Sequence, residues 1–525
     1  MTVKTEPRQT DEKPLCLKKR IGVSVQLFFT LILLILTAAA IWAGGTYSNI
    51  TLEECLFYLS MPLQGTAKQF QEQIIRCVFI PAGIAFALLV AAMFLPRRRR
   101  VVLETKKRKI SLLPLCIRPR TACVILLLWA CIVIPYGNSI LGFRRFLWNQ
   151  LTQSPLIEER YVDPAKTEIR FPEKKRNLIT IYIESAESTN QDIENGGLMD
   201  RNYTPEMTTL AKENISFSQS ELIQGAAIAP ACGWTVAGMV AETGGLPLKM
   251  FTYSETKADN LGKDFISFMP GATFLGDILA KEGYKTVFLC GSDIRFGGRK
   301  QLYEQHGNYE IYDYLRAKEL GWIPENYRVG WGFEDLKLYA YAKELLKALS
   351  ASDQPFHLSF LTVDTHDPGY LCPNCPDNHE NIYGRTLRCS SDQVYEFVEW
   401  CKTQPFWDNT TIVIAGDHAS MTKSLYISAG ASEYDKHNGA VSRLVYNCFV
   451  NSAVSKANEK NRKFTTMDLF PTTLAAMGCS IEGDRLGLGT DLFSGTPTLS
   501  EEMGYETLFE ELGKKSLFYD AKLLR

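Results

Sequence analysis

The chain lacks an appreciable net charge. Its 57 lysine and arginine residues are matched by 58 aspartate and glutamate residues, so the formal net charge is -1 at pH 7. It therefore lacks the basic excess that typifies nucleic-acid-binding proteins. Internal repeats and low-complexity tracts are absent as well. With 46% hydrophobic residues in 525, the chain can build a sizeable core in more than one domain.

Charge is also missing from three long apolar stretches, at about residues 21–42, 77–95 and 121–141. Each stretch comes close to the roughly 20 residues needed to cross a bilayer, so the sequence predicts a membrane domain of three transmembrane helices over residues 21–141. The first stretch is longer than the apolar core of a signal peptide, which has roughly 7 to 15 residues, and we interpret it as a retained span.

Basic residues gather before the first span and between the second and third, whereas the loop between the first two spans holds few. Positive segments stay in the cytoplasm. Residues 1–20 are therefore expected to form a cytoplasmic basic N-terminus, residues 142–176 a juxtamembrane linker, and residues 177–525 an exported domain.

Of the 14 cysteines in the chain, those of the exported part are even in number, which permits disulfides in an oxidising compartment. Cys372-Pro-Asn-Cys375 has the spacing of a zinc or redox motif, but no second such motif is present to complete a tetrahedral zinc site. Because the segment is rich in turn residues and Cys389 is close in sequence, we favour a loop disulfide, with Cys375 and Cys389 as the suspected pair.

From residue 177 onward, strand-like runs alternate with helical ones. The strand-like runs include NLITIYIES (177–185), HLSFLTVDTH (357–366) and NTTIVIAGDH (409–418), and segments with the periodicity of amphipathic helices lie between them. This alternation predicts an α/β fold, with a doubly wound, mostly parallel sheet and helices on both faces.

Acidic and histidine side chains stand at the ends of these three strands. They are Glu184, the segment from Asp364 to His366, and Asp417 with His418. The carboxyl ends of parallel strands face one crevice, so the three ends should converge. Carboxylates and an imidazole are suitable ligands for a divalent cation. One such residue alone is usually a helix cap or a surface residue, but three together predict a metal site.

Thr235 is the candidate nucleophile. It follows a turn at Cys232-Gly233 and precedes an apolar, helix-like run. Its hydroxyl is therefore expected at a helix N-terminus, where free N–H groups and the helix dipole favour phosphate or sulfate. A helix N-cap would occupy the same position, so the residues alone leave both interpretations open.

Seven segments, in order along residues 177 to 495, resemble the motifs of the alkaline phosphatase and sulfatase superfamily. More narrowly, they resemble the membrane-anchored phosphoglycerol transferases that modify periplasmic glucans, which are similar to lipoteichoic acid synthase and to lipid A phosphoethanolamine transferases. Several motifs in one order make chance agreement improbable. The segments are NLITIYIES, CGWTVAGMVAETGGLPL, GSDIRFGGRKQLYEQHG, LTVDTHDP, IVIAGDH, MDLFPTTLAAMG and LGLGTDLFSG.

This resemblance implies that Glu184, Thr235, Asp417 and His418 hold one divalent metal ion, and that Thr235 is also the nucleophile. Carboxylate, hydroxyl and a single imidazole favour manganese, with magnesium and zinc as alternatives.

The resemblance also implies how the substrate is held. Arg299, joined by Arg295, would bind phosphate oxygens, and His366 would contact the head group and transfer a proton. The implied enzyme moves sn-glycerol-1-phosphate from phosphatidylglycerol to Thr235, releases diacylglycerol, and passes the group to a cell-envelope glycan. It would be a multi-pass protein of the bacterial inner membrane with its catalytic domain on the periplasmic side.

Two other functions stay open. One is a phosphoethanolamine transferase acting on lipopolysaccharide or another envelope glycan, and the other is a catalytically silent membrane protein for binding or assembly. A sulfate-ester hydrolase is disfavoured, because the Cys/Ser-x-Pro-x-Arg pattern that yields formylglycine is missing around Cys232. His437 is interpreted as a polar loop residue, and His306 as the end of a helix that stops at Gly307.

Overall fold

A computed structural model divides the chain into two compact units. A helical unit comprises Met1–Thr46 and Lys68–Phe143, and a large unit comprises Tyr47–Ala67 and Arg144–Arg525. His437 lies outside the described residues. These are residues 2–7, 17–47, 50–61, 64–65, 68–94, 99–105, 108–112, 119–250, 256–258, 264–377, 381–422, 425, 443–455 and 458–525.

Three helical stretches of the helical unit are long and apolar enough to cross a membrane, as predicted. They are Ser24–Thr46, Gln71–Ala91 and Cys123–Leu141. The second begins earlier than the sequence suggests, because its helix runs on without a break from a more polar first segment through a π-helical turn. The elements are α1 (Leu17–Thr46), α3 (Lys68–Ile74), η1 (Ile75–Phe79), α4 (Ile80–Phe94) and α5 (Pro119–Leu141).

The large unit is built on a six-stranded sheet in the order β10-β9-β11-β5-β12-β14. The first five strands are parallel, and β14 alone runs antiparallel to its neighbour β12. The predicted doubly wound, mostly parallel sheet is confirmed. The strands are β10 (Glu310–Tyr312), β9 (Lys285–Cys290), β11 (Phe356–Leu361), β5 (Asn177–Ile183), β12 (Thr410–Gly416) and β14 (Asn447–Val450).

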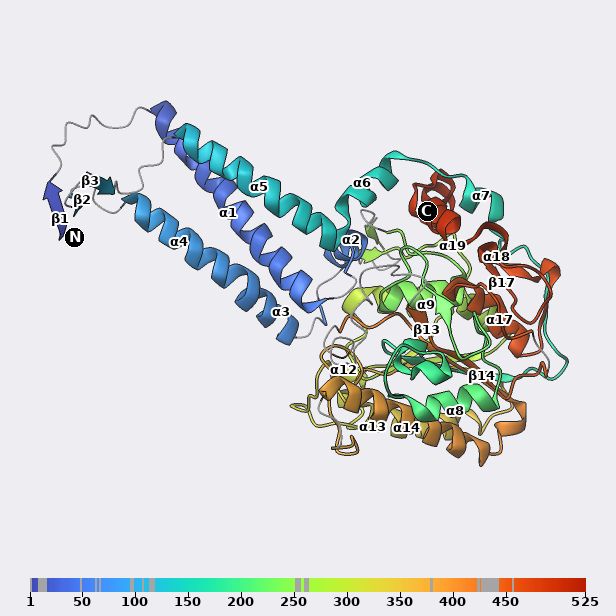
Figure 1. Ribbon diagram of the computed structural model, residues 1–525. Helices are drawn as coiled ribbons and strands as arrows, with labels where there is room; N and C mark the ends of the chain where they lie inside the picture. Colours follow the sequence, from blue (N-terminus) through green and yellow to red (C-terminus); the bar gives the residue numbers. More distant parts are fainter. Residues whose placement is uncertain are drawn as a thin grey trace. The chain divides into compact units, whose positions relative to one another are not determined.

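Helices cover both faces of this sheet. Alternate residues of each strand point to opposite sides, and the central strands β5, β11 and β12 are buried on both sides. In β5, Ile179 and Ile181 belong to a core with α8, α13 and α14, whereas Leu178 and Tyr182 belong to the cores with α9, α10 and α17. Figure 1 shows α8, α13 and α14 side by side along one side of the large unit. The helices are α8 (Pro205–Glu213), α9 (Thr235–Gly244), α10 (Leu275–Lys281), α13 (Asp335–Leu349), α14 (Ile382–Lys402) and α17 (Leu469–Ala476).

Residues 144–176, for which the sequence predicts a linker, lie against the C-terminal part of the large unit. Leu156 and Ile157 of α7 are buried, and β4 pairs with β15. The smaller elements of the large unit include α2 (Leu52–Ser60), α6 (Phe143–Leu151), α7 (Leu156–Arg160), β4 (Ile169–Arg170), β6 (Ala226–Ala227), α11 (Arg299–Gln305), α12 (Tyr314–Glu319), β13 (Leu444–Val445), β15 (Ser480–Ile481), β16 (Arg485–Leu486), β17 (Gly489–Thr490), α18 (Leu499–Met503) and α19 (Tyr505–Gly513).

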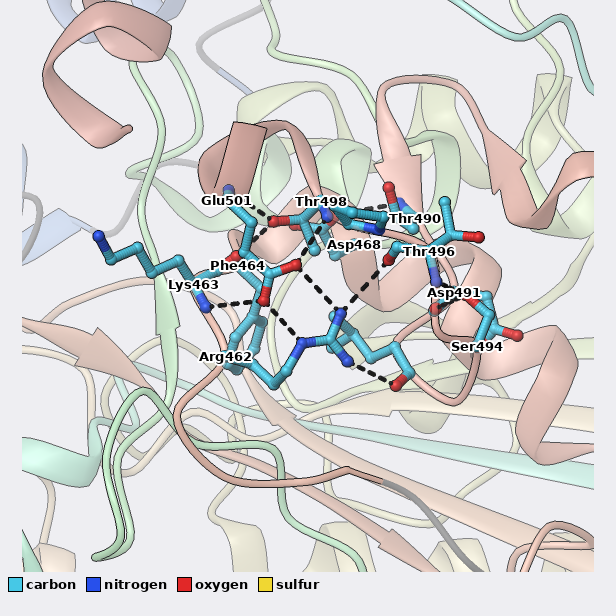
Figure 2. Close-up of polar contacts among 12 residues, drawn as sticks. Arg462, Lys463, Phe464, Asp468, Thr490, Asp491, Ser494, Thr496, Thr498 and Glu501 are labelled. Atoms are coloured by element: carbon cyan, nitrogen blue, oxygen red, sulfur yellow. Dashed lines mark hydrogen bonds and ion pairs between the residues drawn. The ribbon is translucent and has the colours of Figure 1, made fainter. Parts of the chain in front are cut away.

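A polar cluster fastens the LGLGTDLFSG segment to the rest of the large unit (Figure 2). The buried Arg462 donates to the carboxylate of Glu501 at 2.7 Å and to the carbonyl of Leu492 at 3.0 Å. Asp468 accepts from the backbone N–H groups of Thr465 at 2.7 Å and Thr490 at 2.8 Å. This motif is therefore structural, since its polar groups are engaged within the fold.

The suspected disulfide between Cys375 and Cys389 is not present. The cysteines of the described residues are all free thiols. Cys372 lies with both of them, 3.5 Å from Cys389 and 3.7 Å from Cys375 between sulfur atoms. A covalent S–S bond is about 2.0 Å long, so these three thiols touch without being bonded.

Candidate metal centre and its pocket

The ends of β5 and β12 bring the predicted acidic ligands together. The two strands are parallel neighbours, with Ile183 opposite Gly416. The next residues, Glu184 and Asp417, therefore leave the sheet side by side. Together with His418 they offer ligand atoms that all lie within 4.8 Å of one another. The convergence expected from the strand ends is thus observed for two of the three strands.

The third strand end has a different task. Asp364, after β11, accepts a hydrogen bond from the N–H of Asp335 at 3.1 Å, at the N-terminus of α13. Asp335 in turn accepts from the N–H groups of Val363 and Asp364, at 2.7 and 3.0 Å. This reciprocal capping holds the loop after β11 in place. His366 lines the pocket together with Thr362 and Val363 of the same loop.

Ser185 orients both carboxylates. Its N–H donates to Asp417 Oδ1 at 2.8 Å, and its hydroxyl donates to Glu184 Oε1 at 2.8 Å. To do so it takes a left-handed conformation, with φ of 56°. This conformation costs an L-residue other than glycine roughly 1–2 kcal/mol, and such strain tends to be found at functional sites. The sequence contains no signal for this role.

The imidazole of His418 has one nitrogen engaged and one turned to the carboxylates. Nδ1 lies 2.8 Å from the carbonyl oxygen of Ala419 and donates to it. Nε2 lies 3.3 Å from Glu184 Oε1 and 3.4 Å from Asp417 Oδ2. A backbone acceptor on one ring nitrogen is the arrangement that prepares the other nitrogen for a metal ion.

Thr235 joins the same group. Its Oγ1 lies 3.3 Å from His418 Nε2. Trp234 occupies the N-cap position of α9, and Thr235 is the first helical residue. The N-cap interpretation of Thr235 is therefore wrong, and its hydroxyl is directed at the acidic cluster.

Two glycines permit this close assembly. A Cβ on Gly238, one turn into α9, would lie 1.8 Å from the carbonyl oxygen of Asp417. A Cβ on Gly416 would lie 1.9 Å from the carbonyl oxygen of Ala186. Any side chain at either position would push the helix with Thr235, or the strand with Asp417, out of place.

The protonation of the cluster reflects its burial. Burial, together with the neighbouring Glu184, raises the pKa of Asp417 to about 7. Burial acts to lower the pKa of His418, but the carboxylates of Asp417 and Glu184 prevail and raise it to about 10. Burial also acts against ionisation of Glu184, yet His418 holds the pKa of that carboxyl below its usual range. The two carboxylates thus favour a positive charge between them, which the protonated His418 supplies.

The fit of a divalent cation can be tested on the ligand atoms themselves. Asp417 Oδ2 is buried and accepts no hydrogen bond from the described residues. It shares one small space with His418 Nε2, Glu184 Oε1 and Thr235 Oγ1. Three oxygens and one nitrogen suit manganese, magnesium or zinc, so the residues present fit the predicted metal ion.

A pocket opens onto this cluster. Arg299 and His366 are in its wall, with Glu184, Thr235 and His418. Arg299 is buried, and its guanidinium donates to Ser292 Oγ at 2.9 Å and to the carbonyl of Asp293 at 3.0 Å. His366 packs on the ring of Trp331, with a centroid separation of 4.8 Å.

Arg295 is not brought to the pocket wall. Its guanidinium pairs with the carboxylate of Asp293, with 2.7 Å between Nη2 and Oδ2, and its side chain is 40% exposed. His306 ends α11 as predicted, with Gly307 at φ of 102° directly after it.

One wall of the pocket, which the sequence did not predict, comes from the segment between the first two spans. Glu54 and Tyr58 of α2 line the pocket. Phe57 is fully buried beside Trp234, at 5.7 Å between ring centroids, and Tyr58 stacks on Phe296 at 5.2 Å. Thr51 caps α2 by accepting from the N–H of Glu54 at 3.2 Å. The Thr51-x-x-Glu54 capping pattern was a sequence signal for this helix, but nothing in it pointed to the pocket.

Residues 176–479 match the sulfatase family, and they make up more than half of the chain. The chain belongs to the sulfatase family. The matched segment contains the entire six-stranded sheet and every residue predicted to hold the metal ion. Family membership accounts for the fold and for a metal-binding strand end, while the bound group differs among members of such superfamilies.

Among curated relatives, the chain is similar to phosphoglycerol transferase I from two Salmonella strains. It is 35% identical to the Salmonella typhi protein over 273 residues, which is 51% of this chain and 33% of the relative. It is 33% identical to the Salmonella choleraesuis protein over 351 residues, which is 65% of this chain and 41% of the relative. The chain thus spans well under half the length of these relatives.

Two solved structures are also similar. A protein of the alkaline phosphatase superfamily from Vibrio parahaemolyticus is 19% identical, with a TM-score of 0.48 over 68% of this chain and 80% of that one. A lipoteichoic acid synthase from Listeria monocytogenes is 18% identical, with a TM-score of 0.46 over 65% of this chain and 82% of that one.

The contact at Gly238 can be tested directly in this sulfatase-family chain. We expect Gly238→Ala to lower the free energy of unfolding by about 1–3 kcal/mol, as overpacking does, and to weaken Mn²⁺ binding because Thr235 moves away from His418. Urea unfolding and titration calorimetry measure the two effects.

Gly233→Ala is the matched control, because a Cβ there meets only Ile228 at an ordinary 3.6 Å. Equal stability and equal Mn²⁺ affinity in the two variants would show that the approach of α9 to Asp417 does not matter.

Proposed function

We propose that the protein is a metal-dependent phosphoglycerol transferase. It would move sn-glycerol-1-phosphate from phosphatidylglycerol to a cell-envelope glycan and release diacylglycerol. The observation that carries this proposal is the position of the Thr235 hydroxyl, at the first turn of α9 and 3.3 Å from His418 Nε2. The similarity to phosphoglycerol transferase I, which extends over 65% of this chain, supports the choice of the transferred group.

Glu184, Thr235, Asp417 and His418 would hold one divalent cation, with Mn²⁺ favoured by the oxygen-rich donor set. When bound, the cation would lower the pKa of the Thr235 hydroxyl and offset charge on the phosphoryl oxygens. Ser185 would keep the two carboxylates turned toward the ion.

The other residues of the pocket would handle the substrate in two steps. Thr235 Oγ would attack phosphorus at the N-terminus of α9, whose free N–H groups favour the phosphoryl oxygens. His366 would give a proton to the diacylglycerol oxygen as it leaves, and then take one from the acceptor hydroxyl. Arg299 would turn its guanidinium toward the phosphate, with Ser292 and the Asp293 carbonyl fixing its plane. Arg295 would have no direct part.

The membrane topology suits a lipid donor. With residues 1–20 in the cytoplasm and three spans, the large unit would lie on the periplasmic side of the bacterial inner membrane, and the domain from residue 177 onward would hold the catalytic centre. The basic loops on one side of the membrane support this orientation. The partners would be the membrane, phosphatidylglycerol and an envelope glycan.

The covalent step yields a direct test. Full-length protein with Mn²⁺ and labelled phosphatidylglycerol should release diacylglycerol and carry phosphoglycerol on the Thr235 peptide, as read by mass spectrometry. Thr235→Ala should lose the adduct and reduce diacylglycerol release by roughly 10³-fold or more, because the nucleophile acts as one unit with its surroundings.

Thr235→Ser should keep the adduct, since it keeps a hydroxyl. Thr243→Ala on the same helix is the control, because the Thr243 hydroxyl is bonded to the Met239 carbonyl and lies away from the pocket. An undiminished adduct on Thr235→Ala would rule out this nucleophile.

Metal binding should depend on pH in a defined direction. His418, with its pKa raised to about 10, is protonated at pH 7 in the metal-free protein, and it must lose that proton before Nε2 can bind a cation. Asp417, with its pKa raised to about 7, is ionised above pH 8, so between pH 8 and 9 binding releases one proton, that of His418, and the affinity for Mn²⁺ should rise about tenfold per pH unit. Calorimetry in buffers of different ionisation enthalpy counts the proton.

His306→Gln should release the same number of protons as the wild type, since His306 is bonded to Asp277 and to the Phe268 carbonyl and does not line the pocket. A pH-independent Mn²⁺ affinity would contradict the assignment of His418 as a ligand.

Glu54 favours a second candidate, transfer of phosphoethanolamine. Its carboxylate is buried in the pocket wall beside the rings of Tyr58 and Trp331. Burial raises its pKa to about 7, so a bound ammonium group would find a partner that ionises readily. In the phosphoglycerol reaction the same carboxylate would instead accept a hydrogen bond from a glycerol hydroxyl.

Glu54→Gln distinguishes the two reactions. For phosphatidylglycerol we expect kcat/KM to fall by about tenfold or less, because an amide oxygen still accepts a hydrogen bond. Any turnover of phosphatidylethanolamine should be lost, because the charge partner of the ammonium group is gone. Glu53→Gln on the same helix is the control, as Glu53 does not line the pocket. Wild-type preference for phosphatidylethanolamine would make the second candidate the correct one.

A further inference from the structure

Three thiols meet at one point beside α14, away from the pocket wall. Cys372 and Cys375 belong to the loop that follows β11, and Cys389 belongs to α14. One ligand atom of each lies within 4.8 Å of the other two. Cys372 and Cys389 are buried, at 7% and 3% exposure, and Cys375 is half-buried.

The spacing of the three sulfurs is that of ligands around one ion. Cys372 Sγ lies 3.5 Å from Cys389 Sγ and 3.7 Å from Cys375 Sγ. A tetrahedral zinc site with Zn–S bonds of about 2.3 Å puts neighbouring sulfurs about 3.8 Å apart. Three thiols are also an odd number, so pairing any two of them as a disulfide would leave the third as a free thiol next to the bond.

Polar groups around the sulfurs support their acting as thiolates. The backbone N–H of Cys372 donates to Cys375 Sγ at 3.2 Å, and Gln393 Nε2 donates to Cys389 Sγ at 3.0 Å. N–H donors to sulfur stabilise its anionic form and hold ligands in position. Gln393 is itself 7% exposed, and its Oε1 has no hydrogen-bond partner among the described residues. A half-turn of this amide would direct Oε1 at the same space.

We propose that Cys372, Cys375 and Cys389 bind one zinc ion as thiolates, each giving up its proton to solvent. Gln393 Oε1 or a water molecule takes the fourth position of the tetrahedron. The sequence lacks a second CxxC motif, but none is needed. The third sulfur comes from Cys389 of α14, which lies 14 positions after Cys375.

This ion fastens a loop of the active site. The chain from Asp364 to Cys372 carries His366, and it is held at one end by the hydrogen bond from the Tyr370 N–H to the Asp364 carbonyl, at 2.8 Å. The thiol site ties the other end to α14, a helix of the sheet core. Zinc here therefore has a structural task, separate from the acidic cluster that holds the proposed catalytic ion.

Cobalt substitution tests the proposal with a signal that a merely structural cysteine does not produce. Full-length protein, purified in detergent without oxygen and loaded with Co²⁺, should show the near-ultraviolet absorption of thiolate-to-cobalt charge transfer. The band should persist in Asp417→Asn, which removes a ligand of the acidic cluster, and Zn²⁺ should displace one Co²⁺ per chain as the band disappears.

Cys375→Ser and Cys389→Ser should each abolish the charge-transfer band. Cys375 is the half-buried member, so its replacement by serine leaves the core intact and keeps the test valid if Cys389→Ser fails to fold. Cys448→Ser, at a buried thiol of β14 outside the cluster, should keep the band.

Two results would overturn the proposal. One is a disulfide between any two of the three cysteines in protein isolated from its native membrane, found by peptide mass spectrometry without reduction. The other is the absence of the cobalt band while all three thiols titrate as free.

Discussion

The close approach of two buried carboxylates is the constraint on which the structure of the large unit depends. Glu184 and Asp417 are 3% and 0% exposed. Two like charges within 4.8 Å repel by roughly 3 kcal/mol even at an effective dielectric constant of about 20. Ser185 and the His418 ring offset part of this repulsion, and a divalent cation would offset the rest. The arrangement therefore favours a cation between the two carboxylates, and Ser185, with its left-handed backbone, orients both of them.

The packing around these carboxylates follows from the same constraint. Because β5 and β12 are adjacent and in register, the ligands leave the sheet at the same level. Thr235 reaches them only because α9 approaches the chain at Asp417 to backbone contact, which Gly238 allows. Fold stability and site geometry are thus coupled at this one contact. A change that relaxes the packing also moves Thr235, so the effects on stability and on the site should appear together.

The sequence was sufficient for the class of fold and for the meeting of Glu184, Asp417 and His418 at one point. Apolar runs followed by Glu184 and by Asp417-His418 marked two strand ends, and parallel topology alone made their meeting predictable. The side-chain directions were not predictable. Arg295 and Arg299 occur in one short motif, yet Asp293 captures the guanidinium of Arg295 while Arg299 turns inward. Such choices depend on local pairing that the order of residues does not reveal.

Contacts between distant segments were the other limit. Cysteine spacing suggested a disulfide, but three sulfurs meet in the structure without being bonded. The sequence shows how far apart residues are along the chain and does not show how their side chains meet in space. The charges of the loop between the first two spans indicate the membrane orientation, but they do not indicate that this loop places Glu54 in the pocket.

That last contact bears on how the protein works as a whole. Phe57 is fully buried against Trp234, the residue before Thr235, so α2 is an integral part of the pocket rather than a lid over it. The large unit is therefore discontinuous in sequence, with two candidate membrane spans lying between its two segments. Along the chain, both ends of α2 lead into candidate spans, so under the proposed function a lipid head group would meet a pocket wall formed by a segment that is anchored on both sides. An enzyme that takes its donor from the bilayer, as proposed for this protein, would benefit from such a link, because α2 is connected to a candidate span on each side.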